Sequence, residues 1–163
     1  MIYQKTTDMV QIKKCTFEHM TKSYPCKEKS VLDGCMIMRQ SIKPEDVQSP
    51  FQVEAYALLF CISGEVNIIS DLRSYTVTPG TLFVYLPNNI IKIDCKKESI
   101  ISEVLLASDY LRKNFLQWNK ISPLFIQTAN NPVITIPTDR RDELIRMLDN
   151  IQERIKTATC SEW

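Results

Sequence analysis

The chain has 163 residues, of which 44% are hydrophobic and 24% charged, as in an ordinary globular protein rather than a disordered or membrane protein. A chain of this length can bury a sizeable core and fits one domain. Lys and Arg number 20 against 19 Asp and Glu, so the net charge of +1 provides no field that would draw the chain onto nucleic acid.

The N-terminal segment contains no apolar run of the kind that forms a signal peptide, and later apolar stretches are too short to span a bilayer. A cytoplasmic protein is therefore expected. Residues 1–31 are polar and rich in lysine, with few alternating apolar positions. We expect them to form a loosely ordered N-terminal arm with one or two short strands.

In residues 32–107, short apolar runs rich in β-branched residues alternate with turn signals about every 8 to 12 residues. This is the pattern of a sandwich or barrel. The longest run, 53–62, is predicted to be one strand that ends in a tight hairpin at Ser63-Gly64. Turns are predicted at 71–74, 78–81 and 87–89. Further strands are predicted at 65–69, 75–77, 82–86, 90–93 and 101–107.

Residues 108–163 are predicted to be a helical extension of the same domain with one edge strand. Ser108 is a suitable N-cap for a helix that reaches Leu116. Asn130-Asn131-Pro132 then breaks the chain, residues 133–136 resemble an edge strand, and Pro137 marks the start of the final helix.

The final helix has the clearest periodicity in the chain. Its apolar residues follow at spacings of four, three and four, as in a coiled-coil seam: Leu144, Leu148, Ile151 and Ile155. Two heptads do not decide between a helix that lies on its own barrel and a dimer interface, so both alternatives remain open.

Few side chains suit catalysis or metal binding. The single histidine, His19, lies in the polar arm, and the six cysteines are scattered without a Cys-x-x-Cys pair. A metal centre needs several convergent ligands and a nucleophilic triad needs a base, so neither is predicted and no cofactor is expected. The cysteines are expected to be reduced thiols.

Acidic and aromatic residues on the predicted strands are the remaining candidates. Three glutamates are conceivable acid–base groups, although solvated strand faces explain them more simply: Glu54, Glu65 and Glu103. Four aromatic residues could line an apolar pocket, although such residues more often pack in a core: Tyr56, Phe60, Phe83 and Tyr85.

Two stretches resemble the N-terminal regulatory domain of AraC-type transcription regulators, especially those of Bacteroidetes: LLFCISGEV at 58–66 and YTVTPGTLFVYLP at 75–87. The helix start at Ser108, the Ser122-Pro123 pair and the Asn131-Pro132 pair also fit that pattern in order and spacing. The resemblance covers about residues 50–156.

This resemblance implies a mainly β fold: a cupin-like β-barrel (jelly-roll or double-stranded β-helix) followed by C-terminal α-helices. It further implies an unknown small-molecule effector, a homodimer, and DNA contact through a helix-turn-helix domain. No helix-turn-helix pattern is present here, so the chain by itself is not expected to bind an operator. No membrane contact is expected either, because the apolar stretches are too short to span a bilayer.

The resemblance also indicates where an effector would bind. By motif register, the positions that contact the sugar in sugar-sensing members are occupied here by Ser49, Ile93, Ser102 and Val104. With Tyr56 and Tyr85 they form the predicted pocket. This set is small and largely apolar, so a more hydrophobic effector than a sugar, or none, is expected.

We therefore expect a non-catalytic regulatory module that binds an effector, dimerises, or both. The alternative from a different class is a small metal-independent cupin enzyme acting on a sugar-like metabolite, with Glu54, Glu103 or Tyr85 as acid and base. A third possibility is a structural dimer with a filled barrel.

Overall fold

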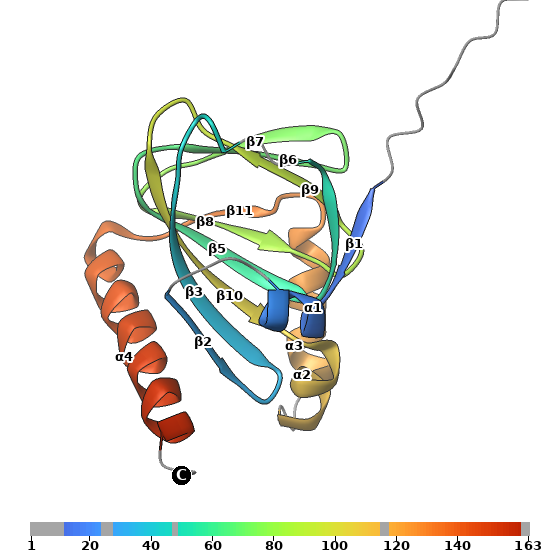
Figure 1. Cartoon of the computed structure of the whole chain (residues 1–163). Helices are drawn as coiled ribbons and strands as arrows, with labels where there is room; N and C mark the ends of the chain where they lie inside the picture. Colours follow the sequence, from blue (N-terminus) through green and yellow to red (C-terminus); the bar gives the residue numbers. More distant parts are fainter. Residues whose placement is uncertain (1–11, 24–27, 47–48, 115–117, 161–163) are drawn as a thin grey trace, which may run out of the picture.

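The computed structural model describes residues 12–23, 28–46, 49–114 and 118–160, in which two β-sheets face each other across the main hydrophobic core (Figure 1). One sheet has five strands, in the order β1 (Lys13–Thr16), β4 (Phe51–Glu54), β9 (Ile90–Asp94), β6 (Val66–Ser70) and β7 (Arg73–Val77). The described part of the other has six, in the order β11 (Val133–Thr135), β8 (Thr81–Tyr85), β5 (Tyr56–Ser63), β10 (Ser99–Leu106), β3 (Cys35–Ile42) and β2 (Glu28–Leu32).

The strand order is that of a jelly-roll. The strands β3–β10–β5–β8 face β4–β9–β6–β7, and the chain passes repeatedly between the two sheets, as in an eight-stranded double Greek key. The predicted mainly β fold, a cupin-like barrel followed by C-terminal helices, is confirmed.

Helices lie at the ends and on the outside of the barrel (Figure 1). They are α1 (Phe17–Ser23), α2 (Ser108–Asn114), α3 (Trp118–Thr128), the 3-10 helix η1 (Thr138–Arg140) and α4 (Arg141–Cys160). Within the described residues, none of them is long and apolar enough to cross a membrane.

The prediction of a hairpin at Ser63-Gly64 is wrong, because β5 and β6 belong to different sheets. Gly64 has a φ of 85°, and a Cβ at this position would lie 2.3 Å from the Ser99 hydroxyl oxygen. That hydroxyl also accepts a hydrogen bond from the Glu65 amide, at 3.1 Å. Glycine therefore lets the chain turn tightly against β10 and cross to the other sheet.

The run 53–62, predicted as one strand, is divided between the two sheets in the same way. It supplies the end of β4 and most of β5, with the fully buried Ala55 between them. Both sides of the break are apolar because both segments face the core, so the hydrophobic pattern gave no sign of the change of sheet.

Part of the predicted N-terminal arm belongs to the barrel. β1 pairs in parallel with β4, and β2 pairs antiparallel with β3, so each sheet gains a strand from this segment. The described residues of the arm thus extend the sheets, while residues 1–11 and 24–27 lie outside the described part of the chain.

α4 lies on the outer face of the six-stranded sheet (Figure 1). Leu148 and Ile155 pack there in a second apolar cluster with Ile37, Phe60 and Val104. An ion pair of 3.6 Å between Asp149 Oδ1 and Arg39 Nη1 links the helix to β3.

The predicted seam of α4 is divided between this contact and the surface. Leu148 is 7% exposed and Ile155 is buried, while Leu144 is half-buried against the same cluster. Ile151 is 41% exposed, and its neighbour Gln152 occupies the buried face instead. The barrel therefore covers most of the seam, and Ile151 remains on its exposed flank.

Because α4 packs on the sheet through only one of its faces, shortening two nearby side chains of the helix should reduce stability by unequal amounts. Leu148→Ala should lower the free energy of unfolding by about 2–4 kcal/mol, because it leaves a cavity between helix and sheet. Ile151→Ala should cost less than about 1 kcal/mol, since this side chain is largely solvated. Urea denaturation at low protein concentration measures both, and equal losses would contradict this docking.

Candidate functional site

A single carboxyl group lies inside the barrel among the described residues of the core strands. Glu103 stands on β10, whose neighbours β3 and β5 place Met38 and Leu59 directly beside it. Both neighbours are fully buried, and Glu103 itself is only 4% exposed. The alternation of β10 explains this position, since Ile101 and Leu105 point to the same inner face.

Tyr85 on β8 reaches this carboxyl group from two strands away. Its hydroxyl donates a hydrogen bond to Glu103 Oε1, at 2.9 Å. Between them on β5 lies Ala57, which is paired with Tyr85 and presents only a methyl group. The Tyr85 ring packs edge-on against Phe83, with 5.4 Å between ring centroids, so its orientation is fixed by the core.

Burial raises the pKa of Glu103 to about 7, and the hydrogen bond from Tyr85 opposes this shift by stabilising the carboxylate. Near neutral pH the group is thus present in both its neutral and its charged form. Chemically it can donate or accept a proton, or hydrogen-bond a polar group within an otherwise apolar enclosure.

The expectation that the three glutamates lie on solvated strand faces holds for Glu54 and Glu65, which are exposed, and is wrong for Glu103. Glu103 is the one charged residue in the apolar run IISEVLL. Two-residue alternation with Ile101 and Leu105 was the available signal that it faces the core.

The six predicted pocket residues do not share one cavity. Tyr85 and Ile93 lie in the barrel core, whereas Val104 belongs to the cluster beneath α4. Ser102 lies two residues before Val104 on β10, so its side chain also points away from the barrel core.

The two remaining pocket residues are also outside the barrel core. Tyr56 packs on Phe125 of α3, with 4.8 Å between ring centroids. Ser49 is exposed in the loop before β4. Of the six predicted pocket residues, the structure therefore places only Tyr85 and Ile93 in the barrel core. Glu103, which was not predicted to face inward, also lies there.

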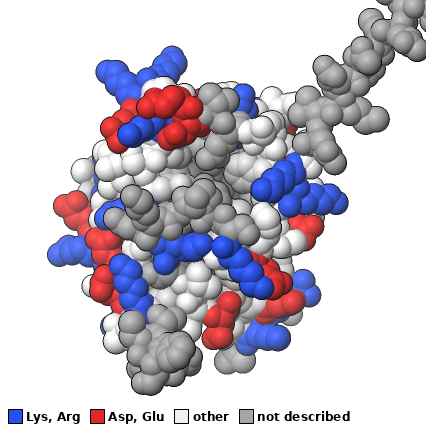
Figure 2. All heavy atoms as spheres, in the orientation of Figure 1, with Lys and Arg blue, Asp and Glu red and all other residues white. Residues whose placement is uncertain are grey.

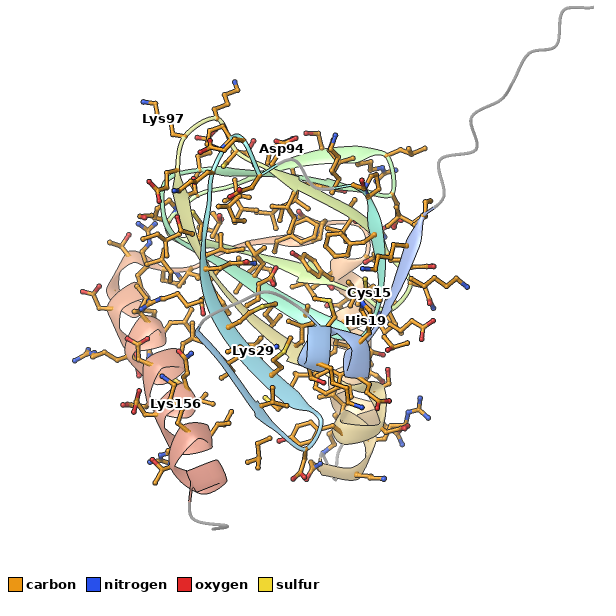
Figure 3. The ribbon with its side chains drawn as sticks, in the orientation of Figure 1. Cys15, His19, Lys29, Asp94, Lys97 and Lys156 are labelled. Atoms are coloured by element: carbon orange, nitrogen blue, oxygen red, sulfur yellow. The ribbon has the colours of Figure 1, made fainter. Side chains whose placement is uncertain are left out.

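The other candidate groups lie apart from this site. His19 is exposed on α1, where Figure 3 shows it near the surface, and its backbone amide donates to the Thr16 hydroxyl at 3.0 Å. Four described cysteines are free thiols, as expected, and burial raises the pKa of each: Cys15, Cys35, Cys61 and Cys95. In the described residues no three His, Cys, Asp or Glu side chains gather as a metal site would require.

No protein-family model matches the chain, and no curated protein matches it in sequence. Several solved cupin structures are similar to part of it. They include a cupin superfamily protein from Desulfitobacterium hafniense (18% identity, TM-score 0.46, 48% of this chain and 72% of that chain). A cupin 2 conserved barrel domain protein from Salinispora arenicola shares 10% identity (TM-score 0.43, 51% of this chain and 71% of that one).

The Clostridium difficile EutQ protein is another structure similar to this chain (17% identity, TM-score 0.40). The match covers 47% of this chain and 59% of EutQ, which is less than two thirds of its length. The strand order of the two sheets is itself that of a cupin-like barrel.

The buried Glu103 predicts a specific dependence of stability on pH. Because its pKa rises from 4.5 to about 7 on folding, its favourable contribution is complete below about pH 4.5 and is lost as the pH rises through 7. Glu103→Gln should therefore become more stable than the wild type by up to about 3 kcal/mol at pH 8, and not at pH 5.

Chemical denaturation at both pH values measures this difference, and the other carboxyl groups cancel between the two proteins. As a control, Glu54→Gln on the exposed face of β4 should shift stability by less than about 0.5 kcal/mol at either pH. A Glu103→Gln effect that is the same at pH 5 and pH 8 would show that the carboxyl group keeps its ordinary pKa.

Proposed function

We propose that the chain is the regulatory domain of an AraC-type transcription regulator and not an enzyme. In this proposal the barrel binds a small effector, α4 mediates homodimerisation, and DNA is contacted through a helix-turn-helix domain of the full regulator. The resemblance of residues 58–66 and 75–87 to that family supports this function, and the arrangement of α4 supports it most directly.

α4 carries more apolar surface than the barrel covers. Leu148 and Ile155 pack on the six-stranded sheet, but Met147 and Ile151 are 51% and 41% exposed on the flank of that face. With the half-buried Leu144 they follow spacings of three and four, as a and d residues do in a coiled coil. A second copy of the helix, packed on this flank, would bury them.

Charge does not oppose such pairing. Lys and Arg lie interspersed with Asp and Glu on the face shown in Figure 2, so two copies would meet without a strong single-sign field. Arg140 of η1 pairs with Glu143 of α4 at 3.0 Å, and within α4 Lys156 pairs with Glu153 at 3.5 Å, which leaves charges of both signs beside the apolar flank.

In this proposal the effector that the barrel binds is mostly apolar. Its described wall is aliphatic and aromatic, and Glu103 with Tyr85 supplies one polar group in the middle. Such an enclosure selects a ligand with an apolar body and a single hydrogen-bonding group. This agrees with the expectation of a more hydrophobic effector than a sugar.

The enzymatic alternative has a specific observation in its favour. Of its three proposed acid–base groups, Glu54 is exposed on β4, while Glu103 and Tyr85 are hydrogen-bonded inside the barrel. A carboxyl group with a pKa near 7 suits general acid–base catalysis on a sugar-like metabolite. Under this alternative, Glu103→Gln would abolish a measurable turnover that the regulatory proposal does not predict.

The dimer predicts that charges on the exposed flank of α4 give a folded monomer. Met147→Glu with Ile151→Glu places two carboxylates in the apolar contact, so the mass by light scattering should halve while the circular dichroism spectrum is kept. Arg146→Glu changes the net charge by the same two units on an exposed side of the helix away from Met147 and Ile151, and this variant should remain dimeric. A wild-type monomer, or a dimer insensitive to the first pair, would refute this interface.

The effector site predicts that a ligand raises the melting temperature through Glu103 and Tyr85. We expect a reproducible shift from a member of a library of sugars, bile acids, fatty acids and aromatic acids. Tyr85→Phe and Glu103→Gln should reduce that shift, whereas Tyr56→Phe on the outer face should keep it. If no compound stabilises a protein that is still dimeric, the barrel is filled and its function is to pair two copies.

A further inference from the structure

A polar pocket of about 290 Å³ lies at the seam between the two sheets. It is formed by the β6–β7 hairpin, the end of β8 with the following loop, and the segment between α3 and β11. Figure 1 shows the chain that enters β11 below the β6–β7 hairpin. Neither Glu103 nor Tyr85 lines this pocket, so it is separate from the site inside the barrel.

The floor of the pocket contains a buried hydroxyl group. Ser70, the last residue of β6, is 8% exposed and lines the pocket from the inner face of its strand. Within the described residues its Oγ has no hydrogen-bond partner. An unsatisfied buried hydroxyl is costly, so a polar ligand atom bound here would be stabilised by it.

Two further donors lie on the same side of the hairpin. Arg73 is paired directly with Ser70 across the two strands, and Tyr75 follows two residues later, so all three side chains share one face. The Tyr75 ring is held by Phe83, with 5.4 Å between ring centroids. Among the described residues, neither the Arg73 guanidinium nor the Tyr75 hydroxyl has an ion-pair or hydrogen-bond partner.

The hairpin turn keeps these donors together. Asp71 and Leu72 adopt φ values of 47° and 70°, the left-handed conformation that a tight two-residue turn requires. The Asp71 carboxylate accepts hydrogen bonds from the Ile90 amide at 2.9 Å and from Asn89 Nδ2 at 2.7 Å. Its charge is thus used to fasten the turn to the β8–β9 loop rather than to pair with Arg73.

These groups define the charge of a ligand. Arg73 is the cation of the pocket lining, and its planar guanidinium can hold a carboxylate through two parallel hydrogen bonds. Asp71 is an exposed residue of the same lining, and its carboxylate would repel a ligand with a second negative charge. Val84, Leu86 and Pro132 supply an apolar wall for the rest of the molecule.

We propose that this pocket binds a small organic monocarboxylate, with its carboxylate on Arg73, Ser70 and Tyr75 and its apolar part on the opposite wall. Its volume suits a ligand smaller than a drug, since pockets for drug-sized ligands run from about 300 to 1,000 Å³. The proposal does not depend on a role in transcription.

The test is titration of the ¹⁵N-labelled chain with benzoate and butyrate, followed by NMR. Saturable shifts should centre on residues 70–75 and 128–132, with a dissociation constant on the order of 1 mM or below. Benzamide, which has the same shape without the charge, should bind at least about tenfold more weakly. Inorganic phosphate, a dianion at pH 8, should also bind more weakly because of Asp71.

Matched variants separate this site from others. Arg73→Gln and Ser70→Ala should each weaken benzoate binding, the first by about tenfold or more. Arg112→Gln, which removes an exposed arginine from α2, should leave it unchanged. Equal binding of benzamide, shifts that centre elsewhere, or unchanged binding by a folded Arg73→Gln variant would overturn the proposal.

Discussion

The six-stranded sheet has to fit two hydrophobic layers at once, one on each face. Along β10, Ile101 and Leu105 face the barrel core, while Val104 and Leu106 face the cluster under α4. The four strands β3, β5, β8 and β10 therefore have apolar residues on both faces, and a shift of one residue would exchange the two layers. The position of α4 and the enclosure of Glu103 both depend on this register.

The burial of both faces of the six-stranded sheet also explains which parts of the fold could be predicted from the sequence. Strand positions and the turns at 71–74, 78–81 and 87–89 were predictable because Pro, Gly, Asn and Asp interrupt apolar runs there. Sheet membership was not, because Ala55 and Gly64 mark crossings between sheets that resemble a continuous strand and a hairpin in sequence. With both faces of β5 buried, no polar alternation shows which way Tyr56 points.

Polar groups enter these apolar layers in two different ways. The Glu103 carboxyl lies deep in the barrel and has a partner from the same chain, Tyr85, so the enclosure tolerates it. The Ser70 hydroxyl lies where the edge of one sheet meets the other, and the described residues around it supply no hydrogen-bond partner. From sequence, Glu103 was identifiable as one charge in an apolar run, whereas a serine at a strand end carries no comparable signal.

The order of strands in the six-stranded sheet also affects how the chain folds. β10 lies between β3 and β5, although about sixty residues of chain separate it from β3. Pairing over such a distance closes a long loop, which slows folding. During synthesis, β3 and β5 emerge first and keep unpaired edges until β10 follows. The nascent barrel is therefore most exposed to aggregation just before residues 99–106 leave the ribosome.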